Sequence, residues 1–345
     1  MRMAVRTSVI ESVNLSLVKG TPKGPVPRGF LVRDHGFEGD AHAGPGPRQV
    51  SLLERPAIRG MEERFGAPLG FGRFGENLVV DGGLAGAAIG DLLAVGDRAV
   101  LEVTAIGKEC HSGCAIRQQT GDCIMPREGV FARVIVGGEV SAGDRVRSLR
   151  PSEDLTVAVL AGGRSTRFGA DKRAAGIDGT TLLQRALDTA RDTTPNVLLS
   201  LAAGEPWTDA AVATPVFDGV ADAGPLAGVV ACLGAATTPL VVFIPVDMPL
   251  VTPDLLKSLA ARCDGPGLAC VDEERTYPLP CCFHHSALPA LESTLGEGRL
   301  SLHEAAARAG TALMKTSMIA GLGEPARLLC NVNTPGDLVG LKTRD

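Results

Sequence analysis

LTVAVLAGGRSTRFGADK, residues 155–172, starts as an almost uninterrupted apolar run and ends in glycines, arginines and a lysine. A short apolar run without charges is typical of a strand buried on both faces of a sheet. In open α/β sheets, ligands bind beyond the carboxyl ends of the strands. We therefore expect the run LTVAVLAG to form the first buried strand of its domain, and LAGGRSTRFGADK (160–172) to form part of a ligand site at its end.

The rest of the C-terminal half shows an alternation of strand-like and helical patterns. The strand-like runs NVLLSLA (196–202) and PLVVFIPVD (239–247) alternate with the helical patterns TLLQRALDTA (181–190) and PDLLKSLAARC (253–263). This alternation predicts βαβ units, and hence an α/β domain with a mostly parallel sheet covered by helices on both faces.

The N-terminal half has a different texture. Its strand-like segments are short, rich in β-branched residues and separated by Gly, Asp and Pro, and a helical stretch over residues 55–65 interrupts them. Such a pattern predicts a β-rich barrel or sandwich. A chain of 345 residues is longer than one ordinary domain, and the pattern of strand-like and helical segments changes at RPSED. We therefore expect domains over 1–149 and 155–345 with a linker over 150–154. The strand-like segments are QVSLL, ENLVV, DLLAV, AVLEVTAI, VFARVIV and DRVRSL.

Composition and charge narrow the classes of partner. The net charge is −5, divided as +2 over residues 1–150 and −7 over residues 151–345, and the chain has one Trp and one Tyr. Without basic runs or many aromatic residues, we expect no nucleic-acid partner. No apolar run is long enough for a membrane span, the N-terminus lacks the apolar core of a signal peptide, and the cysteines do not follow a disulfide framework. These features predict a cytoplasmic protein with small-molecule partners.

The glycine-rich segment after residue 160 is suited to phosphate. Gly162 and Gly163 would let backbone N–H groups approach a polyphosphate, and Arg167 and Lys172 would neutralise its charge. The spacing is neither GxxxxGK[ST] nor GxGxxG, so the motif is not one of the common nucleotide loops. A glycine-rich turn with solvated arginines remains an alternative interpretation.

Asp247 is a candidate metal ligand. It follows the apolar run PLVVFI, and we expect it to emerge at the carboxyl end of another buried strand. A carboxylate placed there among phosphates is well suited to Mg²⁺. A role as helix N-cap is disfavoured, because Thr252 followed by Pro253 marks the helix start later in the chain.

Residues 155–345 resemble the molybdenum cofactor guanylyltransferases, which are nucleotidyltransferases with a Rossmann-like domain. The resemblance rests on four motifs in the family's order: LAGGRSTRFGADK (160–172), DAGPLAG (222–228), FIPVDMP (243–249) and NVNTP (331–335). Related cytidylyltransferases usually read LAAG in place of LAGG, so the resemblance favours guanine over cytosine. A cytidylyl or sugar-phosphate nucleotidyltransferase is the alternative within the same superfamily.

The resemblance implies roles for individual residues. The terminal phosphate of molybdopterin, with or without molybdenum, would attack the α-phosphate of GTP and release pyrophosphate. Arg167, Lys172 and Asp247 would be catalytic, with Mg²⁺ on Asp247. Ser200 stands where the family often has an asparagine and lacks its amide. The implied nucleotide-binding residues are Leu160, Ala161, Gly162, Gly163, Lys172, Ser200, Asp218 and Asp247, and Asn331 and Asn333 would face the pterin.

Most of residues 1–149 resemble a MOSC domain, the β-rich module related to the C-terminal part of molybdenum cofactor sulfurases. The resemblance rests on GFEGDAHAG (36–44), RQVSLLE (48–54), GENLVVDG (75–82) and the segment that starts at GKEC (107–110). It implies a barrel whose characteristic cysteine is Cys110. The domain would bind the cofactor, relay sulfur from a donor protein, or carry the cofactor without catalysis to a client molybdoenzyme.

Cys110, Cys114 and Cys123 form a cysteine cluster in the sequence. A thiolate can accept sulfane sulfur as a persulfide or bind molybdenum as a soft ligand. Zinc is an alternative, but the cluster lacks the paired CxxC spacing of zinc sites. Burial in the core is another alternative, because free cysteines pack well. Nearby cations would form an anion pocket or ordinary surface ion pairs: His35, His42, Arg48, Arg127 and Arg133.

Overall fold

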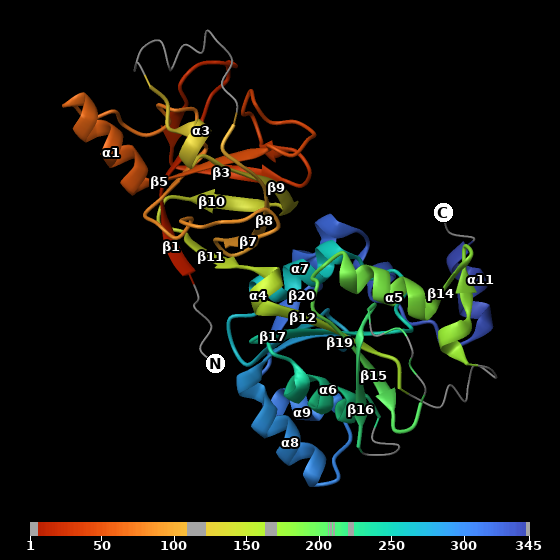
Figure 1. The fold of residues 1–345 in the computed structure, drawn as a ribbon. Coiled ribbons are helices and arrows are strands. Elements are labelled where there is room, and N and C mark those ends of the chain that lie inside the picture. The colour runs from red at the N-terminus through yellow and green to blue at the C-terminus, as the bar shows by residue number, and fades with distance from the viewer. Residues whose placement is uncertain are drawn as a thin grey trace. The chain divides into compact units, whose positions relative to one another are not determined.

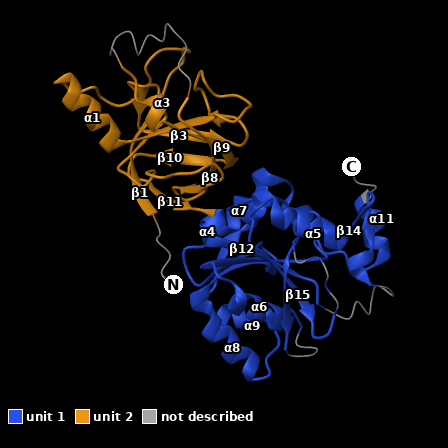
Figure 2. Ribbon diagram, in the orientation of Figure 1, with its two compact units in different colours: residues 1–3, 151–345 blue, residues 4–150 orange. Residues whose placement is uncertain are grey.

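The computed structural model describes residues 6–108, 122–162, 171–205, 207, 209, 211–219 and 224–342. The chain divides into two compact units, one ending at Arg150 and the other beginning at Pro151 (Figure 2). Residues 151–154 of the expected linker form α4 (Pro151–Asp154). In the part of the chain that the structure describes, no helix is long and apolar enough to cross a membrane.

The N-terminal unit is built on a closed barrel of seven strands (Figure 1). The strand order is β11-β7-β8-β9-β5-β6-β1, and pairing of β1 with β11 closes the ring. The expectation of a β-rich barrel is therefore confirmed. The barrel strands are β1 (Arg6–Leu15), β5 (Val50–Glu54), β6 (Leu78–Val80), β7 (Leu92–Val95), β8 (Ala99–Ile106), β9 (Val130–Val136) and β11 (Arg145–Leu149).

Smaller elements complete the N-terminal unit. Strand β2 (Gly24–Val26) pairs with β1, and a separate sheet has the order β10-β3-β4, with β3 at Arg28–Val32, β4 at Gly36–Phe37 and β10 at Gly138–Ser141. The predicted helix is α1 (Arg55–Phe65). It ends at Gly66, whose φ of 69° places it in the left-handed conformation that glycine adopts most readily. Buried residues of α1 pack with α3 (Met125–Glu128) in a second apolar cluster.

The C-terminal unit contains the expected mostly parallel sheet (Figure 1). Its strand order is β16-β15-β12-β17-β19-β18-β20, and β19 runs antiparallel to both of its neighbours while the other pairs are parallel. All residues of the central strand β12 are buried. The strands are β12 (Leu155–Leu160), β15 (Val197–Ala202), β16 (Thr214–Asp218), β17 (Leu240–Pro245), β18 (Gly267–Val271), β19 (Thr276–His284) and β20 (Ala312–Lys315).

Helices cover both faces of this sheet (Figure 1). Helices α6 (Gly224–Ala235), α8 (Leu288–Gly296) and α9 (Leu302–Arg308) pack together on one face. Helices α5 (Leu182–Arg191) and α7 (Pro253–Arg262) cover the other face, and each begins at a threonine whose hydroxyl accepts a backbone hydrogen bond. The remaining elements are α10 (Pro325–Leu328), α11 (Pro335–Lys342), the hairpin β13 (Gly176–Ile177) and β14 (Thr180–Thr181), and the 3₁₀ turns η1 (Lys172–Ala174), η2 (His285–Ala287), η3 (Thr316–Met318) and η4 (Ala320–Leu322).

The carboxyl ends of the central parallel strands meet at one edge. Leu160 at the end of β12 lies opposite Ser200 of β15 and Pro245 of β17. Helix α6 approaches these strand ends closely at Gly228, where a Cβ atom would lie 2.5 Å from the Ser200 hydroxyl oxygen and 3.2 Å from Leu160 Cδ2. The second glycine of the DAGPLAG segment is therefore needed for this close contact. The edge is the place where ligands bind in such sheets.

Candidate active site

A single turn of 3₁₀ helix follows the glycine-rich loop. Residues 163–170, which include the predicted site residues Gly163 and Arg167, lie outside the described residues. The described chain resumes at Asp171, whose carboxylate accepts a 3.0 Å hydrogen bond from the Arg173 backbone N–H and so caps η1. The capped turn holds Lys172 and Arg173 as neighbours on one short element.

Lys172 and Asp247, predicted from separate motifs, form an ion pair. Lys172 Nζ lies 2.9 Å from Asp247 Oδ2, and the two side chains are 15% and 23% exposed. The other carboxylate oxygen, Oδ1, is buried and has no hydrogen-bond partner among the described residues. A buried carboxylate oxygen without a partner is costly, and it is a hard ligand of the kind that Mg²⁺ prefers. The residues present therefore fit a bound Mg²⁺ ion.

The NVNTP segment is attached to Asp247 through its backbone. Val332 is fully buried, and its N–H donates a 2.8 Å hydrogen bond to the Asp247 carbonyl oxygen. Its neighbours Asn331 and Asn333 are exposed. Asp337 accepts hydrogen bonds from the N–H groups of Asn333 and Thr334 at 2.7 and 2.8 Å, and these bonds lower the pKa of Asp337. The segment is thus attached to the Asp247 backbone at Val332, and the asparagines on either side of Val332 are open to solvent.

Gly162 and Asp218, also predicted from separate motifs, lie together on the β15 side of the edge. A Cβ atom at Gly162 would lie 3.4 Å from Asp218 Oδ2. Asp218 ends β16, and burial together with the charge of Glu205 raises its pKa. Glu205 therefore lies near enough to Asp218 for their charges to interact.

An ion-pair bridge formed by Asp171, Arg173 and Glu205 connects η1 to the end of β15. Arg173 Nη1 donates to Glu205 Oε2 at 2.7 Å, and Arg173 Nε and Nη2 each donate to the Asp171 carboxylate at 3.0 Å. Sequence reasoning did not identify Arg173 or Glu205. Arg173 stands next to Lys172 in the sequence, and Glu205 stands just after the NVLLSLA strand. Neither feature shows that the two side chains pair with each other.

The remaining predicted nucleotide residues lie at the end of β12 or beneath it. Leu160 and Ala161 are almost completely buried, and the Ala161 N–H donates a 3.1 Å hydrogen bond to the Ser200 carbonyl oxygen. Ser200 is 1% exposed, and its hydroxyl oxygen lies against the Gly228 position of α6. The Ser200 side chain therefore faces the covering helix.

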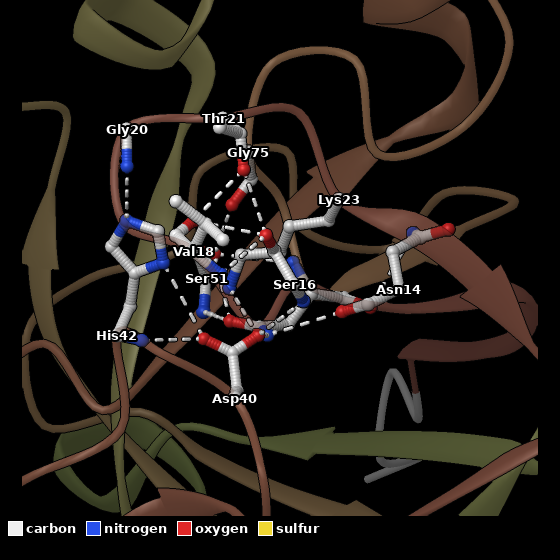
Figure 3. Close-up of polar contacts among 11 residues, drawn as sticks. Asn14, Ser16, Val18, Gly20, Thr21, Lys23, Asp40, His42, Ser51 and Gly75 are labelled. Carbon is white, nitrogen blue, oxygen red and sulfur yellow. Dashed lines mark hydrogen bonds and ion pairs between the residues drawn. The ribbon is translucent and has the colours of Figure 1, made fainter.

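The N-terminal unit contains a second Lys–Asp pair, within a buried polar cluster (Figure 3). Lys23 Nζ lies 2.8 Å from Asp40 Oδ2, and both side chains are 2% exposed. Asp40 Oδ2 also accepts from Asn77 Nδ2 at 3.0 Å, and Oδ1 accepts from the His42 N–H at 2.8 Å. His42 Nε2 accepts from the Gly20 N–H at 3.3 Å. Both oxygens of Asp40 are thus occupied by neighbours in the same unit.

Glu76 lies fully buried next to this cluster. Its carboxylate accepts hydrogen bonds from the Gly72 and Phe74 N–H groups at 2.6 and 2.9 Å. Burial raises the pKa of Glu76 to about 7, and these hydrogen bonds only partly oppose the shift. Burial also lowers the pKa of Lys23. Burial opposes the shift at Asp40, but the hydrogen bonds and charges of Lys23 and His42 together lower the pKa of Asp40.

The predicted sulfur and anion sites are only partly described. Cys110 and Cys114 lie outside the described residues. Cys123 is 3% exposed and packs in the apolar cluster beside α1, as the core interpretation requires. Three arginines in the suggested anion pocket contact other side chains: Arg127 pairs with Asp122 at 3.0 Å, Arg133 pairs with Asp34 and Glu102 at 3.0 Å, and the Arg48 guanidinium lies 5.4 Å from the centre of the Phe131 ring.

Comparison with known proteins places both units in families. A family model for the MobA-like NTP transferase domain matches residues 157–310, and one for the MOSC domain matches residues 38–147. A probable molybdenum cofactor guanylyltransferase of Chloroflexus aggregans is 34% identical over 188 residues, which cover 52% of this chain and 89% of the relative. The chain belongs to the molybdenum cofactor guanylyltransferases. A second probable guanylyltransferase, from Deinococcus radiodurans, is 34% identical over 55% of this chain and 95% of the relative.

These two guanylyltransferases match only about half of this chain. The MOSC domain is therefore additional to the part that they share with it. Among solved structures, molybdopterin-guanine dinucleotide biosynthesis protein A from Archaeoglobus fulgidus is 21% identical, with a TM-score of 0.47 over 55% of this chain and 97% of that chain.

Proposed function

We propose that the C-terminal unit transfers GMP from GTP to molybdopterin, or to molybdopterin that already holds molybdenum, with release of pyrophosphate. The observation that supports this most directly is the Lys172–Asp247 pair at the carboxyl edge of the mostly parallel sheet. One oxygen of its carboxylate has no partner among the residues that the structure describes. We place this domain at residues 155–345, with a MOSC domain at 1–149.

The chemistry requires charge stabilisation more than a base. A phosphate oxygen of molybdopterin forms a bond to the α-phosphorus of GTP, and the bond from that phosphorus to the bridging oxygen breaks, so pyrophosphate leaves with the electron pair. A phosphate monoester is largely dianionic at neutral pH, so no strong base is needed, but two anions must be brought together. Lys172 and, from the loop, Arg167 would offset this repulsion. Asp247 Oδ1 would hold Mg²⁺, which supplies further positive charge.

The two sides of the edge suggest where each substrate binds. Leu160, Ala161, Gly162 and Gly163 would line the GTP site, with Asp218 beside Gly162. A carboxylate can accept two parallel hydrogen bonds from guanine, through its ring N–H and its amino group, but only one from the amino group of cytosine, so Asp218 supports GTP over CTP. Asn331 and Asn333, on either side of Val332 and exposed, would contact the pterin. Because the Ser200 hydroxyl faces α6, we propose that Ser200 supports the nucleotide site from beneath.

For the MOSC domain we propose cofactor binding or sulfur relay through Cys110 and Cys114, with Cys123 supporting the same segment from the core. A sulfur donor protein or a client molybdoenzyme would be the partner. Mass spectrometry after incubation with a cysteine desulfurase should detect a persulfide on Cys110 or Cys114. If neither residue gains sulfur and the cofactor still binds after both are replaced by serine, the domain is a carrier.

A nucleotide panel tests the transferase assignment. The full chain is incubated with molybdopterin, Mg²⁺ and either GTP or CTP, and pyrophosphate and the dinucleotide product are measured. A parallel reaction offers a sugar 1-phosphate in place of molybdopterin. We expect product with GTP and molybdopterin, loss of product when a chelator removes Mg²⁺, and little product in the other reactions. Preferred use of CTP or of the sugar phosphate would show that the alternative activity is correct.

A further inference from the structure

The ion-pair bridge holds a very short element in place. Turn η1 has three residues, too few to be stable without tertiary contacts. Arg173 contacts Asp171 at the start of the turn and Glu205 beyond the end of β15. The adjacent residue, Lys172, reaches in the other direction to Asp247 beyond β17. Turn η1 is therefore attached on both sides of β12, which lies between β15 and β17.

The bridge is expected to contribute little to the folding free energy. The side chains of Arg173, Asp171 and Glu205 are all partly exposed, and such ion pairs typically contribute about 0–1 kcal/mol to folding. Arginine differs from lysine in that its planar fork fixes direction as well as distance. What the bridge determines is the position of η1, and with it the position of Lys172.

The bridge also controls charge near the nucleotide. Glu205 lies close enough to contribute to the raised pKa of Asp218, which lies beside Gly162. A triphosphate at this edge would meet both carboxylates. The Arg173 guanidinium, 2.7 Å from Glu205, neutralises one of them. Without Arg173, the repulsion between Glu205 and the triphosphate would act without compensation.

We propose that Arg173 is a positioning residue of the nucleotidyl transfer site, which it serves in two ways. It holds Lys172 at Asp247 by fixing η1 between the ends of β15 and β17, and it neutralises Glu205 beside the GTP site. The inference rests on the proposed function, since it assigns a role within that reaction. It predicts separate effects on kcat, through Lys172, and on KM for GTP, through Glu205.

A double-mutant cycle in the full chain separates the two effects. We expect Arg173→Ala to lower kcat on the order of tenfold or more, because small displacements of catalytic groups are costly, and to raise the KM for GTP. Glu205→Gln weakens the bridge and leaves the Arg173 charge paired with Asp171 alone, so it should lower kcat without raising the KM. The double variant should recover the KM of the wild type but not its kcat, and Arg173→Lys should be intermediate.

The control is Arg191→Ala, which removes an exposed arginine from the last turn of α5 and should leave both constants unchanged. The melting temperature of each variant should stay within about 4 °C of wild type, as expected for a partly exposed ion pair. If Arg173→Ala does not fold, Glu205→Gln and Arg173→Lys decide the matter through kcat. A wild-type kcat in Glu205→Gln and Arg173→Lys would overturn the inference. So would a double variant whose KM for GTP stays as high as that of Arg173→Ala. A wild-type chain without GMP transfer would instead overturn the proposed function.

Discussion

Two Lys–Asp pairs, one in each unit, have the same chemistry and opposite environments. In the barrel, Lys23 and Asp40 are almost completely buried, and both carboxylate oxygens accept hydrogen bonds from neighbouring groups. At the sheet edge, Lys172 and Asp247 are partly exposed, and one carboxylate oxygen has no partner in the described part of the chain. We infer that the buried pair, whose carboxylate oxygens all have partners, stabilises the barrel. The pair at the sheet edge has a carboxylate oxygen that is available to a ligand.

The largest effect is expected when the buried pair is broken. Lys23→Met leaves the Asp40 carboxylate buried without its counter-ion, which should cost about 3–5 kcal/mol of folding free energy. Hydrogen exchange measured by mass spectrometry on peptides of the barrel would report this loss separately from the C-terminal unit. The matched variant Lys172→Met should cost less folding free energy than Lys23→Met, because this pair keeps some contact with solvent, while abolishing GMP transfer. Equal destabilisation by both substitutions would remove the distinction between the two pairs.

The next effect concerns the open carboxylate. Asp247→Asn keeps the shape of the side chain but removes the negative charge that pairs with Lys172 and would hold Mg²⁺. We expect kcat to fall about 10²–10³-fold, as when one charge-stabilising group is removed from a reaction site, with an unchanged melting temperature. Asp264→Asn, in an exposed loop after α7, is the control. Near-normal turnover in Asp247→Asn would show that the unpartnered oxygen has no catalytic role.

The difference between the pairs also marks the limit of prediction from sequence. Lys172 and Asp247 could be predicted because each follows a buried strand in a recognisable motif, and parallel strands bring their carboxyl ends together. Lys23 stands in TPKGP, a segment that resembles an exposed turn. Its burial depends on Asp40, 17 residues later, and local pattern carries no information on such a contact.

The same limit applies to residues beside the predicted site. Strand β8 was predicted with its observed bounds, because alternation and flanking glycines define it locally. Arg173 and Glu205 are 32 positions apart, so local sequence pattern provides no means to select Glu205 among the many carboxylates of the chain. The orientation of Ser200 depends on how closely α6 approaches at Gly228, which is a property of tertiary packing.

Measuring the stability of the barrel as a function of pH would test whether Glu76 is protonated in the folded state. Because burial raises the pKa of Glu76 from 4.5 to about 7, the folded state holds a proton between these values that the unfolded state has lost. The contribution of Glu76 to stability is therefore greatest below pH 4.5 and falls as the pH rises through 7, by on the order of 3 kcal/mol. Glu76→Gln should flatten the pH dependence of barrel stability over this window. An unchanged slope would show that Glu76 is already ionised in the folded barrel.

The smallest effect is expected at Gly162, beside the open site. The methyl group of Gly162→Ala would lie 3.4 Å from Asp218 Oδ2, close enough to displace a base that approaches this carboxylate but not to disturb the fold. A single added methyl group in a binding site typically changes discrimination by about tenfold. We expect the ratio of kcat/KM for GTP to that for CTP to fall by this factor, mainly through a higher KM for GTP. Gly234→Ala on α6, where the nearest atom to the new Cβ is 3.9 Å away, should leave the ratio unchanged. If the ratio were also unchanged in Gly162→Ala, the approach of Gly162 to Asp218 would have no part in selecting guanine, and selection would have to lie in other residues of the edge.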